Sequence, residues 1–171
     1  MNCGDGDAPG RQHDGEPGDI AELQTQMAAM TRGAGDPEEL IAAVRDAPLL
    51  LALLAPEQLW TCELEETQWL FAFTTTSELH AFLQQKWDAS QPGDLPPELA
   101  QHAVYLRING AELLEDLIPA LMERDRLPYG VALDVSSPQR TFLPPLPGIV
   151  PEHAALDLNA AAGAGTGGTA A

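Results

Sequence analysis

Apolar and polar residues alternate over residues 59–74, the stretch around which we expect the fold to form. The apolar members of this alternation are Trp60, Cys62, Leu64, Trp69, Phe71 and Phe73. A period of two is typical of a β-strand with one buried face. The polar residues 65–68 separate two such runs and predict a turn. The stretch is therefore predicted to be a hairpin whose apolar side chains, including that of Cys62, point into the core.

The hydrophobic period changes after the second strand. Thr75 and Glu78 have the spacing of a capping box, which marks the start of a helix. The apolar residues that follow at helical spacing are Leu79, Phe82, Leu83 and Trp87. This strand–strand–helix unit contains all three Trp and three of the four Phe of the chain. Because aromatic side chains bury the largest area per residue, the core is predicted to form on this unit.

Two further elements are predicted before the hairpin. Asp36 is a typical N-cap and Pro37 suits the first turn of a helix, which ends where Pro48 forces the preceding residue out of helical geometry. The predicted buried face of this helix consists of Leu40, Ile41 and Val44. The apolar run 49–54 then predicts a fully buried strand.

The second half of the chain has a strand–helix–strand pattern. Alternation over residues 103–108 predicts a strand, and Asn109 is a good N-cap for the helical spacing that follows. Pro119 lies inside this helical pattern, so we expect two short helical segments or a bend. Residues 129–135 predict another strand, and residues 141–143 a short edge strand.

These elements predict an α+β fold with a single mixed β-sheet of about five strands and helices mainly on one face. We expect this globular domain at residues 36–146. Residues 1–35 are acidic and rich in Gly, which predicts a mostly disordered leader with one weak helical pattern at residues 20–30. Residues 147–171 are rich in Pro, Ala and Gly and predict a flexible tail.

The chain carries 26 acidic and 8 basic residues, a net charge of −18 at pH 7. Binding to nucleic acid or to an anionic membrane surface needs clustered Lys and Arg, whereas Lys86 is the only lysine here. We therefore expect no nucleic-acid partner and no membrane contact. A negative charge of this size also keeps a protein soluble, so it does not identify a basic partner, and the oligomeric state stays open.

The cysteines and the apolar segments bear on the compartment. Cys3 lies in the predicted leader and Cys62 in a predicted strand, so we expect two free thiols in a reducing environment. The apolar run at residues 49–55 is too short to span a bilayer, and the N-terminal residues do not have the apolar segment of a secretory signal. A cytoplasmic location is predicted.

No arrangement of residues in the sequence predicts catalysis. The four histidines do not have the spacing of metal ligands. The acidic neighbours of Cys62 disfavour the thiolate form that a nucleophile requires. Glu63, Glu65 and Glu66 are typical of a solvated hairpin turn, with a cation site as the less favoured interpretation. We predict no catalytic residue, no cofactor and no metal.

Tyr105, Arg107 and Tyr129 form the candidate protein-binding surface. Tyr and Arg are enriched among the residues that dominate protein–protein interfaces. These three side chains are predicted to project from one sheet face, provided that the strand 103–108 is central and that face is uncovered. The alternative is that they cover the stem of a helix.

Three segments of the chain resemble a known family. They are FTTTSELHAF at residues 73–82, AVYLRINGAELLEDLI at 103–118 and GVALDVSSPQRTFLPP at 130–145. Over residues 37–145 the pattern is similar to the SseB N-terminal domain family, which is common in actinobacteria. The resemblance implies an α+β domain without established catalytic residues. The chain departs from the family at residues 134–138, where the family often has Asn-Pro-Gly.

The sequence favours a non-catalytic, cytoplasmic interaction module that binds a protein partner through one sheet face or groove. The alternative is a small enzyme or ligand-binding domain with its site near the linker at residues 88–102, where His102 and neighbouring acids gather. A broad exposed apolar patch would favour the first function, and a deep pocket with converging polar groups the second.

Overall fold

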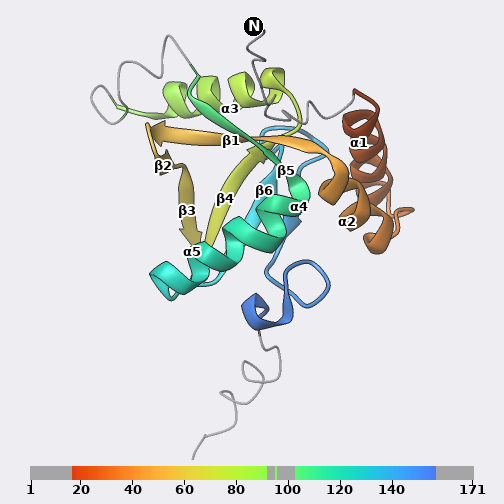
Figure 1. Ribbon diagram of the computed structural model, residues 1–171. Helices are drawn as coiled ribbons and strands as arrows, with labels where there is room; N and C mark the ends of the chain where they lie inside the picture. Colours follow the sequence, from red (N-terminus) through yellow and green to blue (C-terminus); the bar gives the residue numbers. More distant parts are fainter. Residues whose placement is uncertain (1–16, 92–94, 96–102, 157–171) are drawn as a thin grey trace, which may run out of the picture.

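The computed structural model describes residues 17–91, 95 and 103–156. The helices are α1 (Pro17–Thr31), α2 (Pro37–Asp46), α3 (Thr76–Ala89), α4 (Gly110–Glu112) and α5 (Ile118–Asp125), with a π-helical turn η2 (Leu113–Leu117) and a 3-10 turn η3 (Glu152–Ala154). The strands are β1 (Pro48–Ala55), β2 (Gln58–Leu59), β3 (Thr61–Leu64), β4 (Thr67–Phe73), β5 (Tyr105–Asn109), β6 (Tyr129–Leu133) and β7 (Thr141–Leu143). Figure 1 shows their arrangement.

All the strands belong to one mixed sheet, which confirms the predicted α+β class. The main path is β2-β1-β4-β6-β7, with β3 paired to β4 and β5 paired to β1. The β4–β6 pair is parallel, and the other strand pairs are antiparallel. The sheet has seven strands rather than about five. The short strand β2 was not predicted because the turn before it contains Glu57 at φ 66°, where sequence reasoning looks for Gly or Asn.

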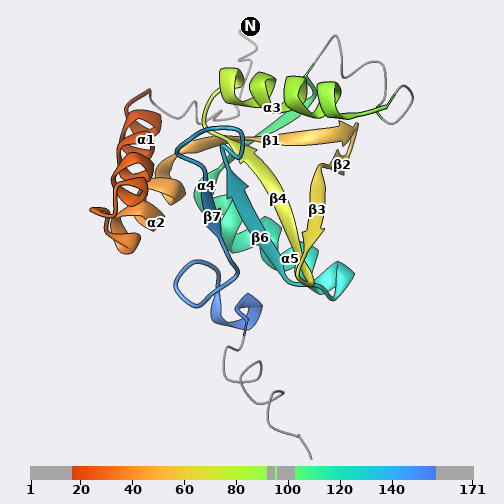
Figure 2. The ribbon, with the colours of Figure 1, turned by 180° about the vertical axis from the view of Figure 1, so that it is seen from behind.

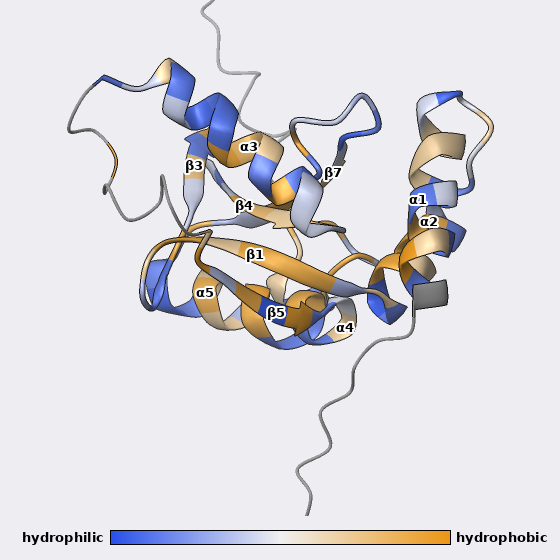
Figure 3. Ribbon diagram, turned by 90° about the horizontal axis from the view of Figure 1, so that it is seen from above, coloured by the Kyte–Doolittle hydropathy of each residue, from blue (hydrophilic) through white to orange (hydrophobic). Residues whose placement is uncertain are grey.

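The helices form two layers around this sheet. One face packs on α2 and on the α4–η2–α5 segment, in a core that includes Leu51, Val131 and Leu133. The opposite face, with Leu50, Phe73 and Ala132, packs on α3. Figure 3 shows α3 on one side of β1 and β4, and α4 and α5 on the other. The helices thus lie mainly on one face, and α3 lies on part of the second.

Residues that were predicted to lie in a leader and a tail belong to the core. The helix α1 packs against α2, and its Leu23 and Met27 are 0% and 1% exposed. Near the other end, Val150 and Ala154 are 4% exposed. The predicted limits at residues 36 and 146 therefore enclose too little of the chain. A short amphipathic pattern is a weak signal for a helix, because most of its stability comes from packing that the sequence does not display.

The three predicted N-caps are confirmed. The Asp36 carboxylate accepts a hydrogen bond from the Glu38 backbone N–H at 2.8 Å. The Thr75 hydroxyl accepts from the Glu78 N–H at 3.2 Å, and the Asn109 side chain accepts from the Ala111 N–H at 2.9 Å. Each cap satisfies a backbone donor that a helix leaves free at its start.

The helical segment after Asn109 accommodates Pro119 through a change of pitch. The π-helical turn η2 lies directly before α5, and its last bond runs from the Ile118 N–H to the Leu113 carbonyl. Widening the turn makes room for the proline ring, which has no N–H to donate. The segment is accordingly divided into α4, η2 and α5, as the prediction of shorter helical pieces requires.

The β3–β4 hairpin closes more tightly than predicted. Leu64 pairs with Thr67, so Glu65 and Glu66 alone form the loop. Both have positive φ, 51° and 63°, as the central residues of a type I′ turn do. Glutamate is a poor residue for this conformation, because at positive φ its Cβ comes too close to a backbone carbonyl oxygen. Glycine has no Cβ and avoids this clash.

Candidate functional site

The helix α3 covers only part of the sheet face on which it lies. Phe82 of α3 is the centre of this contact, with its ring centroid 5.1 Å from that of Trp60, 4.9 Å from that of Phe71 and 5.2 Å from that of Phe73. Phe82 is 1% exposed and Phe73 0%. We call Trp60, Phe71, Phe73 and Phe82 the covered half of this face.

The same face continues beyond α3 as an open half, made of Cys62, Leu64, Trp69 and Phe142. Leu64 is 59% exposed and Phe142 49% exposed, and Trp69 is half-buried. The rings of Trp69 and Phe142 meet edge to face, with centroids 5.5 Å apart. Figure 2 shows this face, with α3 across the upper part of the sheet and β3, β4, β6 and β7 running below it.

Cys62 lies in this open half and not in the core. It is exposed, and its thiol is free. The alternation correctly predicted that Cys62 shares a face with Phe71, because both contribute to the same hollow. The prediction that it points into the core is wrong, because α3 does not extend over β3.

Small residues on β6 create a hollow between the two halves. Gly130 leaves space for the Trp69 ring, since an added Cβ would lie 2.7 Å from its Cζ3 atom. Ala132 is 1% exposed and lies in the lining between larger side chains. The resulting hollow has a volume of about 240 Å³ and is half open to solvent, with walls formed by Trp69, Phe71, Phe82 and Phe142.

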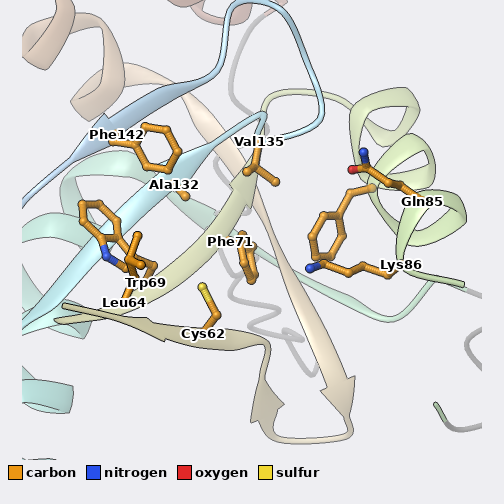
Figure 4. A pocket seen from close by; sticks show the side chains of 10 residues that line it. Cys62, Leu64, Trp69, Phe71, Gln85, Lys86, Ala132, Val135 and Phe142 are labelled. Atoms are coloured by element: carbon orange, nitrogen blue, oxygen red, sulfur yellow. The ribbon is translucent and has the colours of Figure 1, made fainter. Parts of the chain in front are cut away.

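Two polar side chains of α3 stand at the edge of the hollow. Lys86 Nζ lies 5.5 Å from the Phe82 ring centroid and 5.8 Å from that of Phe71. The Gln85 side-chain oxygen accepts a hydrogen bond of 3.0 Å from the Ser136 hydroxyl. Figure 4 shows Gln85 and Lys86 on the α3 side, with Trp69 and Phe142 opposite them and the Cys62 Sγ directed between. None of the described residues that line the hollow is acidic.

The indole N–H of Trp69 is enclosed and has no hydrogen-bond partner among the described residues. A buried donor without a partner typically costs about 1–3 kcal/mol. Among the residues of the open half, Trp69 therefore holds a polar group that the described part of the chain leaves unsatisfied.

Asp134 fixes the ends of the two parallel strands beside the hollow. Its carboxylate accepts hydrogen bonds from the Thr74 N–H at 2.9 Å and the Thr74 hydroxyl at 2.7 Å. Gln24 of α1 donates to the same hydroxyl at 3.3 Å. Asp134 is 4% exposed and has a φ of 45°. Burial raises the pKa of its carboxyl group, which outweighs the lowering by the Thr74 donors.

The predicted surface of Tyr105, Arg107 and Tyr129 is not brought together. Tyr105 and Arg107 are exposed and lie two positions apart on β5, on the same face of the sheet. Among the described strands β5 pairs only with β1, so it lies at an edge of the sheet. Tyr129 is 6% exposed and packs in the core on the opposite face. The prediction required β5 to be central, whereas β5 lies at an edge.

Tyr129 is held instead by residues at the end of α5. Its hydroxyl donates to the Asp125 carboxylate at 2.6 Å, and Arg124 Nε donates to the other carboxylate oxygen at the same distance. The Arg124 side chain and then the Tyr129 hydroxyl lower the pKa of Asp125 to about 2. Burial, followed by the hydrogen bond to Asp125, raises the pKa of Tyr129. This cluster connects α5 to β6.

Two other features are relevant in the described part of the chain, a metal site and a membrane-spanning helix. Within it, no group of three or more His, Cys, Asp or Glu is placed to hold a metal ion. None of its helices is long and apolar enough to cross a membrane. The alternative site at the linker 88–102, with His102, lies largely outside the described residues. Comparison of the chain with protein-family models, curated proteins and solved structures gave no match.

Proposed function

We propose that the chain is a non-catalytic, cytoplasmic protein-interaction module that binds a partner protein through the open half of its sheet. The exposure of Leu64 and Phe142 around the hollow carries this proposal. Contiguous exposed apolar side chains on a soluble protein mark interaction surfaces. Burial of such side chains in an interface is favourable by about 25 cal/mol per Å² of apolar area.

The kinds of residue in the open half support a protein partner. Trp and Phe supply large rigid contact areas, and aromatic residues are enriched at the centres of protein interfaces. The hollow beside them is apolar, with Phe71 and Ala132 in its lining. An interface that places one anchor side chain in such a hollow excludes water from it.

The size of the hollow also favours a protein over a small ligand. Its volume is about 240 Å³. Pockets for drug-sized ligands are usually about 300–1,000 Å³ and enclose most of the ligand. A half-open hollow of the smaller size accommodates one side chain of a partner, while Leu64 and Phe142 contact the surface around it.

The family resemblance and the linker site remain predictions. Similarity to the SseB N-terminal domain family supports a non-catalytic role, since that resemblance implies no catalytic residue. The alternative, a small enzyme or ligand-binding domain with a site near residues 88–102, would place function away from the open half. The experiment below separates the two.

The proposal is tested by replacing the exposed apolar side chains. We expect the double variant Leu64→Ser/Phe142→Ser to fold normally and to lose most of the partner protein that the unaltered chain retains in a pull-down from the native lysate. Both side chains are about half exposed, so the substitutions remove apolar contact area without opening the core. Quantitative mass spectrometry of the retained proteins measures the loss.

Two matched controls locate the surface. Leu106→Ser removes a leucine that is 45% exposed on the edge strand β5 and should leave the retained partner unchanged. Tyr105→Ala/Arg107→Ala tests the surface first predicted from the sequence. Loss of the partner from this β5 variant, with full retention by the Leu64→Ser/Phe142→Ser variant, would assign binding to β5 and overturn the proposal.

A further inference from the structure

We infer that the partner inserts a bulky apolar side chain into the hollow and that an adjoining Asp or Glu of the same partner segment binds Lys86. This inference rests on the proposed function, because it names the chemistry of the segment that the open half binds. The evidence for it is the position of Gln85 and Lys86 at the edge of the hollow.

These groups offer hydrogen-bond donors and no negative charge. Lys86 and Gln85 line the hollow on the α3 side, and none of the lining residues is acidic. The absence of acids here contrasts with the 26 acidic residues of the chain. The Gln85 oxygen already accepts from Ser136, so the amide NH₂ group, which has no partner within the described ranges, is left to donate. Lys86 and Gln85 therefore favour a hydrogen-bond acceptor on the partner, and a carboxylate is the strongest acceptor among protein side chains.

Lys86 is available to such a carboxylate. The ion pairs between described residues are Arg45–Glu115 and Arg124–Asp125, so Lys86 has no acidic partner in this part of the chain. Its Nζ lies over the rings of Phe71 and Phe82 instead. Contact with aromatic faces holds the cation in place without neutralising it. An incoming carboxylate would meet a charge that is already positioned.

The hollow and Lys86 are close enough for the apolar group and the carboxylate to come from neighbouring residues of one segment. Phe71 and Phe82 are walls of the hollow and also the rings beneath Lys86, at 5.8 Å and 5.5 Å from Nζ. Consecutive Cα atoms are about 3.8 Å apart, so a separation of this size is spanned by one or two residues. The inferred motif is a Leu, Met or Phe with Asp or Glu within two positions.

A displayed library of random internal heptapeptides tests this motif. The full chain is attached through a C-terminal tag, and bound peptides are counter-selected against Ala132→Leu, which fills the hollow from its floor, and against Leu64→Ser/Phe142→Ser. We expect the selected peptides to combine an apolar residue with Asp or Glu. Replacing that acid by Asn or Gln in a synthetic peptide should weaken binding about tenfold. The selection is repeated on Lys86→Glu, where Lys or Arg should replace the acid.

The outcomes separate this inference from the proposed function. If no peptide depends on the open half in either counter-selection, the proposed function itself fails. If peptides depend on the open half but show no acidic residue, and Lys86→Glu selects the same sequences, the proposed function stands and the role of Lys86 is overturned. The double variant keeps the experiment decisive if Ala132→Leu does not fold, which circular dichroism establishes beforehand.

Discussion

Phe71 and Phe73 are 5% and 0% exposed beneath α3, whereas Leu64 and Phe142 on the same sheet face are 59% and 49% exposed. Both halves contain Trp and Phe side chains, and the open half adds Cys62 and Leu64. They differ in what lies over them, because α3 places Phe82 on Trp60, Phe71 and Phe73 and does not cross β3 or β7.

The comparison separates two properties that a hydrophobic pattern combines. Alternation determines which face of a strand a side chain occupies. Burial depends in addition on whether another element covers that position. The apolar stripe of the hairpin is longer than the part that α3 covers, and the uncovered part is available to a partner. Substitutions in the covered half should therefore lower the stability of the fold, and substitutions in the open half should lower the binding of a partner.

The largest expected effect is that of Phe82→Ala in the covered half. The substitution removes a ring that contacts three other aromatic side chains and leaves a cavity under α3. We expect the free energy of unfolding to fall by about 3–5 kcal/mol, measured by chemical denaturation. Phe142→Ala is the matched variant in the open half and should cost about 1 kcal/mol or less, since it loses mainly the edge contact with Trp69. If Phe82→Ala and Phe142→Ala lowered the free energy of unfolding equally, the distinction between the covered and open halves would be wrong.

Gly130→Ala tests how the open half is shaped. The new Cβ would lie 2.7 Å from Trp69 Cζ3 and 3.1 Å from the Leu143 carbonyl oxygen, so the Trp69 ring must move. We expect a loss of about 1–3 kcal/mol and a shifted NMR resonance for the Trp69 indole N–H. An unchanged resonance would show that the ring does not depend on the glycine.

The hairpin turn offers a gain in stability that affects both halves together. Glu65→Asn/Glu66→Gly places residues suited to positive φ at 51° and 63°. We expect the free energy of unfolding to rise by about 1 kcal/mol, because Asn-Gly is the preferred pair for this turn. Chemical denaturation measures the change. The variant Glu63→Gln, which alters a nearby charge without changing the turn, should not reproduce it.

The smallest expected effect is a change in pH dependence at Asp134. Burial raises its pKa, so Asp134 favours folding most below its ordinary pKa of 3.8, and this contribution is lost as the pH rises through the higher folded-state pKa. Asp134→Asn cannot titrate. The unfolding free energy of the unaltered chain, minus that of Asp134→Asn, should fall as the pH rises above 3.8. A difference that is constant with pH would contradict the raised pKa.

Local patterns predicted the elements well, and long-range contacts explain what they missed. The caps at Asp36, Thr75 and Asn109 were identified because each depends on residues two or three positions away. The predicted surface was wrong for Tyr129 because strand order, which places β5 at an edge and β6 inside, is not encoded locally.

The candidate site was only partly visible in the sequence. The alternation identified Trp69 and Cys62 as members of one face, but Phe142 stood in a strand too short to assign to either face. Gly130 and Ala132 were the available signal for the hollow, since two small residues in a buried strand leave space that larger neighbours enclose. That signal becomes specific only when β4 and β7 are known to flank β6.

The position of the only lysine has a practical consequence. Lys86 lines the hollow on α3, and no other side chain of the protein is a primary amine. Chemical coupling of the protein to a resin or sensor chip through amines would therefore react at Lys86 or at the α-amino group. Coupling at Lys86 would block the surface proposed to bind, and a negative result from such a preparation would reflect the attachment chemistry rather than the absence of a partner.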